Sequence, residues 1–111
     1  MEQVFQKLVR DRIPEMIEKN GEVAVTRILN DEEYRLELYR KLREECEEVI
    51  HAEDSSNRVE ELADVLEVVK AIAILEGKTI EDVLEEASKK AEKRGGFQKR
   101  IFLEKTYSKG E

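Results

Sequence analysis

Two carboxylates lie where a helix of this sequence should be apolar. When residues 57–76 are projected as a helix at about 100° per residue, Glu61 and Asp64 fall inside an apolar stripe. The stripe is formed by Val65, Val68, Ile72 and Leu75, and Asp64 projects between Ala71 and Leu75. Because the two acidic residues are three positions apart, both lie on one face of the helix. Burying such groups costs several kcal/mol without a positive partner, so the pair requires one.

The preceding predicted helix carries a second acidic pair at the same spacing. Glu45 falls on the edge of a stripe marked by Leu38 and Val49, and Glu48 falls just beyond it. If the two helices are antiparallel neighbours, both pairs face each other and repel unless a cation lies between them. Carboxylate oxygens favour a hard cation, Mg²⁺ or Mn²⁺. The single Cys and single His, without ligand-like spacing, argue against zinc.

Two structural interpretations compete with a metal site. The run from Glu44 to Glu48 is also typical of a solvated helix face in a Glu-rich protein. A buried Lys or Arg could neutralise Glu61 and Asp64 without any metal. On residue spacing alone these alternatives stay open.

The elements that would position these residues are mainly helical, because one Pro and five Gly leave few breaks in the chain. The predicted helices run from Pro14, with Asp11 as N-cap, to Asn20, from Asn30-Asp31 to about Ala52, from about Asn57 to Glu76, and from Thr79 to Arg94. Residues 23–29 and 98–104 are apolar enough for a possible short β ribbon. The predicted fold is an antiparallel helical bundle in one domain, residues 1–111.

The composition narrows the function classes. With 27 acidic and 20 basic residues the net charge is −7, which argues against nucleic acid or an anionic membrane as a partner. We expect no membrane span, since no apolar run approaches the roughly 20 residues required, and no signal peptide. Cys46 alone cannot form an intrachain disulfide, which fits a cytoplasmic protein.

Beyond spacing, the acidic pattern resembles a known family. Glu44-Glu45-x-x-Glu48 followed by Glu61-x-x-Asp64 resembles the motif of the MazG-like all-α nucleoside triphosphate pyrophosphohydrolases, a superfamily that includes phosphoribosyl-ATP pyrophosphohydrolases. Residues 7–15 and 93–103 look like a small house-cleaning branch of that superfamily. The resemblance implies Mg²⁺-dependent hydrolysis of a nucleoside triphosphate, including non-canonical ones, to the monophosphate and pyrophosphate.

The resemblance also assigns roles to individual residues. The implied metal ligands are Glu45, Glu48, Glu61 and Asp64, with Mg²⁺ or substituting Mn²⁺ as the ion. The implied catalytic residues are Glu44, which would orient water, and Glu48. The candidates for phosphate contact are Lys90, Lys93, Arg94, Lys7 and Arg10. Each basic group has a structural alternative, because Lys and Arg also complement a helix C-terminus and an Arg–Asp pair could hold the N-terminal segment to the body.

Two alternative functions remain. One is phosphoribosyl-ATP hydrolysis, and the other is a non-catalytic helical adaptor that associates through residues 57–76, which are apolar nearly all round. A homodimer or higher homo-oligomer is expected on either hypothesis. The aromatic residues available to stack on a base are Tyr34, Tyr39, Phe5 and Phe97, and spacing does not choose among them. Members of the superfamily often carry an Asn near the downstream basic residues, which this chain lacks after Asn57.

Overall fold

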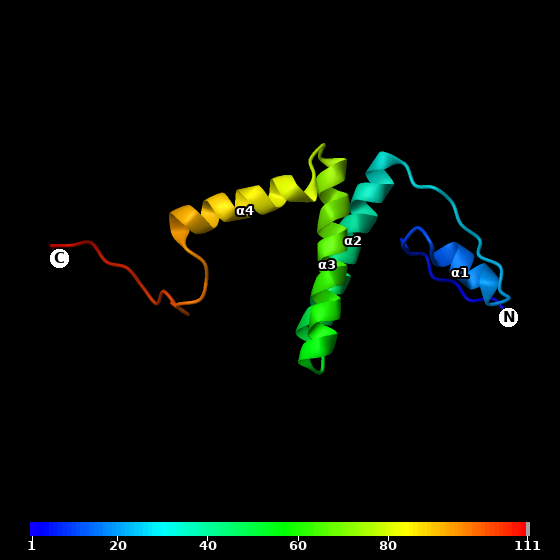
Figure 1. Ribbon diagram of the computed structural model, residues 1–111, viewed down its shortest axis with the longest axis horizontal. Coiled ribbons are helices and arrows are strands. Elements are labelled where there is room, and N and C mark those ends of the chain that lie inside the picture. The colour runs from blue at the N-terminus through cyan, green and yellow to red at the C-terminus, as the bar shows by residue number, and fades with distance from the viewer. Residues whose placement is uncertain (111) are drawn as a thin grey trace. The chain divides into compact units, whose positions relative to one another are not determined.

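The computed structural model describes residues 1–110, which form four helices and no strand (Figure 1). The helices are α1 (Ile13–Lys19), α2 (Asp31–Ile50), α3 (Ser55–Leu75) and α4 (Ile80–Arg94). The mainly α prediction is therefore confirmed. The chain divides into a first compact unit, residues 1–80, and a second one from Glu81 onward. That residues 1–111 form one domain remains a prediction. Residue 111 lies outside the part of the chain that the structure describes.

Helix α2 begins where its sequence predicts, because Asn30 forms a reciprocal capping box with Glu33. The Asn30 side chain accepts a hydrogen bond from the Glu33 backbone at 2.9 Å, and the Glu33 carboxylate accepts one from the Asn30 backbone at 3.4 Å. Arg27 binds the same carboxylate at 3.1 Å. Hydrogen bonding from Arg27 lowers the pKa of Glu33. The capping box and the ion pair hold the segment before α2 to its first turn.

Helix α3 begins earlier than predicted, at Ser55 rather than near Asn57. The reason is that Asp54 is the N-cap and accepts a hydrogen bond from the Asn57 backbone at 2.8 Å. Arg58, one turn into α3, donates to the Val49 carbonyl at 3.3 Å and to the Ala52 carbonyl at 2.5 Å. These bonds satisfy one carbonyl in the last turn of α2 and one in the short loop, after which α3 returns antiparallel to α2 and the two helices form a hairpin.

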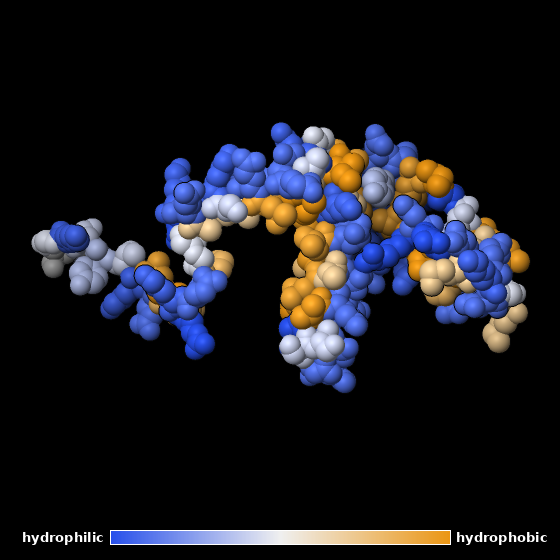
Figure 2. Space-filling view, viewed as in Figure 1, coloured by the Kyte–Doolittle hydropathy of each residue, from blue (hydrophilic) through white to orange (hydrophobic). Residues whose placement is uncertain are grey.

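The hairpin of α2 and α3 contains the core of the first unit. Leu38 of α2 and both Val68 and Ala73 of α3 are buried. The predicted stripe of α3 is buried or half-buried, and an ion pair between Arg35 and Glu76 joins the helices at the end away from the loop. A second apolar stripe of α3, marked by Leu62, Leu66, Val69 and Ala73, is different, because Leu62 and Leu66 are exposed (Figure 2). The hairpin therefore has one packed face and one uncovered apolar face.

The start of α1 differs from its prediction. The N-cap is Arg12 rather than Asp11, and no side chain caps the helix. Pro14 occupies the second helical position, where its missing N–H costs nothing because that donor would be unpaired in any case. Proline geometry, rather than a cap, sets where this short helix begins.

The possible β ribbon is absent from the described residues. Residues 23–29 and 98–104 are extended or irregular and contain no strand. Val23, Val25 and Ile28 are exposed, so the apolar side chains of residues 23–29 have no surface to pack on. A two-stranded ribbon is marginal without such a surface, which explains why β-branched residues alone were insufficient.

The second unit contains α4 and the segment after it. Glu81 and Asp82 lie in the first turn of α4, and Lys93 and Arg94 lie in the last turn, which complements the helix dipole at both ends. Gly95 follows at φ +82°, a conformation that ends a helix at low cost only for glycine. Over residues 1–110, none of the helices has the length and apolar character that a bilayer span requires.

Candidate metal centre

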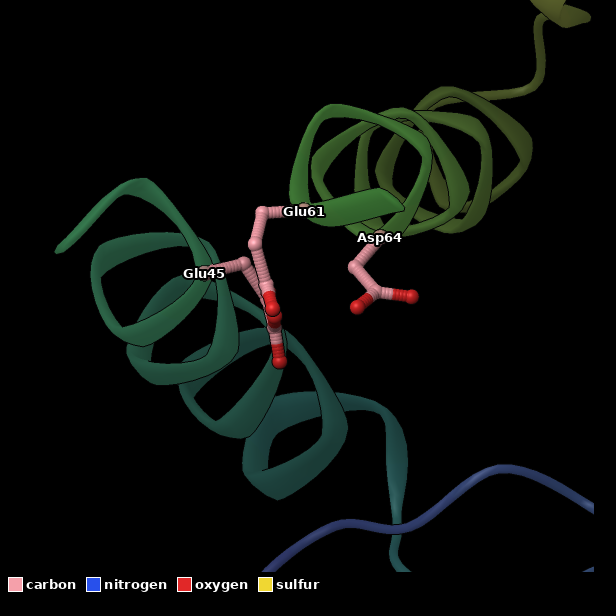
Figure 3. Close-up of side chains that lie close together, drawn as sticks. All are labelled: Glu45, Glu61 and Asp64. Carbon is pink, nitrogen blue, oxygen red and sulfur yellow. The ribbon is translucent and has the colours of Figure 1, made fainter. Parts of the chain in front are cut away.

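Three carboxylates from α2 and α3 converge at the helix interface. One oxygen each of Glu45, Glu61 and Asp64 lies within 4.8 Å of the other two. Figure 3 shows Glu45 extending from α2 and both Glu61 and Asp64 extending from α3, with their carboxylates directed into the space between the helices. We call these three residues the acidic cluster. The arrangement follows from the hairpin, since the short loop brings the two acidic pairs to the same level.

Glu48, the fourth predicted ligand, lies beside the acidic cluster rather than within it. Its side chain is exposed, yet its charge contributes to raising the pKa of Glu61. Glu44 is half-buried and lies 3.9 Å from the Lys41 ammonium. The structure therefore brings three of the four predicted ligands together, with Glu48 near enough to interact through charge.

The environment of Glu61 shows how strongly the carboxylates oppose one another. Partial desolvation between the helices raises the pKa of Glu61 above its ordinary value, and the charges of Glu48, Asp64, Glu45 and Glu60 raise it further. The acidic cluster therefore gains stability from any added positive charge, whether a proton, a basic side chain or a metal ion.

The raised pKa predicts how the stability of the metal-free protein depends on pH. The folded state binds the Glu61 proton more tightly than the unfolded state, so this contribution is present at low pH and is lost as pH rises through the raised pKa. Glu61→Gln removes the titration while Glu45, Glu48, Glu60, Asp64, Lys41 and Arg10 remain around the site. We expect the melting temperature of the variant, relative to wild type in chelator, to rise as the pH increases above the ordinary carboxyl range of about 4. Parallel pH profiles for the two proteins would contradict this prediction.

Two basic side chains already contact the acidic cluster. Lys41, 20% exposed, lies 3.6 Å from an oxygen of Glu45, which is 13% exposed. Arg10, in the segment before α1, donates a hydrogen bond to Asp64 Oδ1 at 2.6 Å. The Arg–Asp pair that was the structural alternative is therefore present, with Asp64 of α3 as the partner of Arg10. The contact of Lys41 could be predicted from its four-residue spacing to Glu45. That of Arg10 spans 54 positions and leaves no local signal.

The other residues predicted to contact phosphate belong to different segments of the chain. Lys90, Lys93 and Arg94 are exposed on the later turns of α4, in the second unit. Lys7 is exposed in the N-terminal segment, three residues before Arg10. Their roles toward phosphate stay predictions.

Comparison with known proteins adds a family match. A sequence model of the MazG nucleotide pyrophosphohydrolase domain matches residues 34–96, more than half of the chain and the whole of the acidic cluster. An uncharacterised protein of Mycolicibacterium smegmatis is 51% identical over 43 residues, which cover 39% of this chain and 44% of that protein. The match therefore spans less than half of that relative's length. No solved structure matches the chain.

Proposed function

The chain belongs to the MazG nucleotide pyrophosphohydrolase domain family, and from this premise we propose that it hydrolyses a nucleoside triphosphate to the monophosphate and pyrophosphate with Mg²⁺ as cofactor. One observation carries the proposal: Glu45, Glu61 and Asp64 place carboxylate oxygens within 4.8 Å of one another inside the matched region. Non-canonical triphosphates are included among the substrates. The cytoplasmic location remains a prediction.

The residues present fit a hard divalent cation. The donor set consists only of carboxylate oxygens, which Mg²⁺ and Mn²⁺ prefer, and it comes from two helices packed on each other. Its mutual repulsion, expressed in the raised pKa of Glu61, is relieved by positive charge. When bound, the ion would neutralise phosphate oxygens and activate water. Glu45, Glu61 and Asp64 would hold it, with Glu48 as a further ligand.

The remaining residues would act on the substrate. Glu44 and Glu48, on the rim of the acidic cluster, are the groups we propose to orient the attacking water and receive its proton. Phosphate charge calls for cations from the protein, and we propose Lys7, Arg10, Lys90, Lys93 and Arg94 for that contact. Among them, Arg10 already lies at the acidic cluster.

A panel of triphosphates with product analysis tests the function. The full chain is incubated with canonical and modified nucleoside triphosphates and with phosphoribosyl-ATP, each with Mg²⁺, with Mn²⁺ and with chelator. We expect monophosphate and pyrophosphate to appear only with metal. Turnover of phosphoribosyl-ATP alone would select the neighbouring activity of the superfamily. An absence of products on every substrate, with no thermal stabilisation by metal, would rule out the enzymatic function.

Removing Arg10 should strengthen metal binding. The Arg10 guanidinium occupies Asp64 Oδ1, so a metal ion must compete with it for that oxygen. For Arg10→Gln we expect Mn²⁺ to bind about two- to fivefold more tightly by calorimetry, the range that an exposed ion pair allows. Arg12→Gln is the matched control, since Arg12 pairs with Glu15 at 3.2 Å outside the acidic cluster. Weaker metal binding in Arg10→Gln would show instead that Arg10 supports the site.

We also propose that the chain forms a homodimer through the uncovered face of α3. Leu62 and Leu66 are 51% and 52% exposed, and Val59 on the same stripe is exposed as well. Exposed apolar residues in one continuous row mark an interaction surface more often than a surface that stays in contact with solvent. The adaptor hypothesis shares this surface, but it offers no reason for the acidic cluster, so we rank it below the enzyme.

A further inference from the structure

A groove of about 370 Å³ lies in the first unit, between the N-terminal segment and the α2–α3 hairpin. The residues that matter for its chemistry are Asp11, Tyr34, Glu67, Lys70, Ala71 and Ile74. Asp11 comes from the N-terminal segment, Tyr34 from the first turn of α2, and the others from the second half of α3. The volume falls within the range of small-molecule sites and suits one nucleoside.

The groove lies further along α3 than the acidic cluster. Asp64 and Ala71 are seven residues apart, which places them on nearly the same face of the helix and about 10 Å apart along its axis. The N-terminal segment makes the same connection independently. Arg10 binds Asp64 at 2.6 Å, and the next residue, Asp11, lines the groove. A molecule in the groove therefore lies about two turns of α3 from Asp64.

The lining of the groove combines apolar surface with unpaired polar groups. Ala71 and Ile74 supply apolar surface, and Tyr34 supplies an aromatic ring. The side chains of Asp11, Glu67 and Lys70 are exposed and make no hydrogen bond or ion pair within residues 1–110. A flat base stacks on an aromatic ring and presents hydrogen-bonding groups at its edge, which is the chemistry that this lining matches.

We propose that this groove binds the nucleoside half of the triphosphate, with the base against Tyr34 and the phosphates directed along α3 toward the acidic cluster and Arg10. This inference rests on the proposed function and deepens it. Two of the three free polar groups, Asp11 and Glu67, are carboxylates that accept hydrogen bonds and cannot donate them. Two such acceptors call for two N–H donors at the edge of the base. The exocyclic amino group of cytosine supplies two, whereas uracil offers only its ring N3–H, so a base with an amino group is preferred.

The test compares a nucleotide with inorganic tripolyphosphate on the same proteins. The nucleotides are cytidine and uridine triphosphate analogues with a non-hydrolysable α,β-bridge, and all ligands are titrated with Mg²⁺ by calorimetry. Ala71→Phe fills the groove, and Arg43→Phe introduces the same ring at an exposed position of α2 as the matched control. Tyr34→Ala removes the stacking surface without adding volume, and it decides the outcome if Ala71→Phe does not fold.

We expect Ala71→Phe and Tyr34→Ala to weaken binding of the cytidine analogue by about tenfold or more. Binding of tripolyphosphate should be unchanged in both variants, because it has no nucleoside. Unchanged nucleotide binding, or an equal loss for both ligands in Tyr34→Ala, would overturn the groove assignment. Equal affinity for the cytidine and uridine analogues would overturn the role given to Asp11 and Glu67.

The two proposals fail in different ways. If the analogues bind as expected but the natural triphosphates are not hydrolysed, the groove assignment holds and the proposed enzymatic function fails. If tripolyphosphate and metal bind but neither nucleotide analogue does, the groove assignment fails while the metal centre stands.

Discussion

Glu61→Gln should lower the rate of metal-dependent triphosphate hydrolysis by at least about 10²-fold, which is the largest effect expected for any single substitution in this chain. Glu61 belongs to the acidic cluster, and its pKa is raised by desolvation and by four neighbouring carboxylates. The glutamine keeps the shape of the side chain but removes its charge. Metal affinity and the stabilisation of the phosphates should fall together.

The same variant should remain folded, which separates a functional effect from misfolding. Without metal, replacing one of several mutually repelling carboxylates reduces charge repulsion in the folded state. Glu61→Gln should therefore melt no lower than wild type in chelator at neutral pH. With Mg²⁺, wild type should gain thermal stability and the variant should gain much less. Glu60→Gln, an exposed neighbour on α3, is the matched control and should retain activity. Full hydrolysis by Glu61→Gln would remove the acidic cluster from the mechanism.

Leu66→Asp should dissociate the proposed homodimer. Leu66 is half-exposed in the middle of the uncovered apolar stripe of α3, with Leu62 one turn before it and Val69 one turn after it. A carboxylate at that position would be desolvated without a partner in a closed interface. We expect the dissociation constant to rise by at least about 30-fold, measured by sedimentation velocity over a range of concentrations.

Thermal unfolding provides the second measurement for this variant. The melting temperature of wild type should increase with protein concentration, as for any folded state that is stabilised by association, whereas that of Leu66→Asp should not. Arg43→Asp places the same carboxylate on the exposed side of α2 and should leave assembly intact. A monomeric wild-type chain that Leu66→Asp destabilises would show that the stripe is covered within the chain.

Local features of the fold could be predicted because their interactions lie within a few residues. The capping box at Asn30, the proline start of α1 and the glycine after Arg94 each involve neighbours in sequence. The start of α3 was predicted late because several consecutive residues are competent caps, and Asp54 is the one that binds. The β ribbon failed for another reason, since β propensity does not supply a surface to pack on.

In the candidate site, too, features within one helix could be predicted and contacts between distant segments could not. The spacing of three between Glu45 and Glu48, and between Glu61 and Asp64, shows that each pair shares a helix face. It does not show how far each helix is rotated toward the other, and that rotation leaves Glu48 outside the acidic cluster. Arg10, 54 positions from Asp64, and the groove beside Tyr34 depend on how the N-terminal segment packs on the hairpin.

The sequence by itself therefore determined the helices, the cap of α2, the acidic pairs and the family, because hydrogen bonds and side-chain neighbours within one or two turns follow from residue order. Only the tertiary structure decided which carboxylates meet, which basic groups neutralise them and where a groove opens beside them. Those contacts join distant segments whose relative rotation and approach are set by packing around Leu38 and Val68, and no local pattern records that packing.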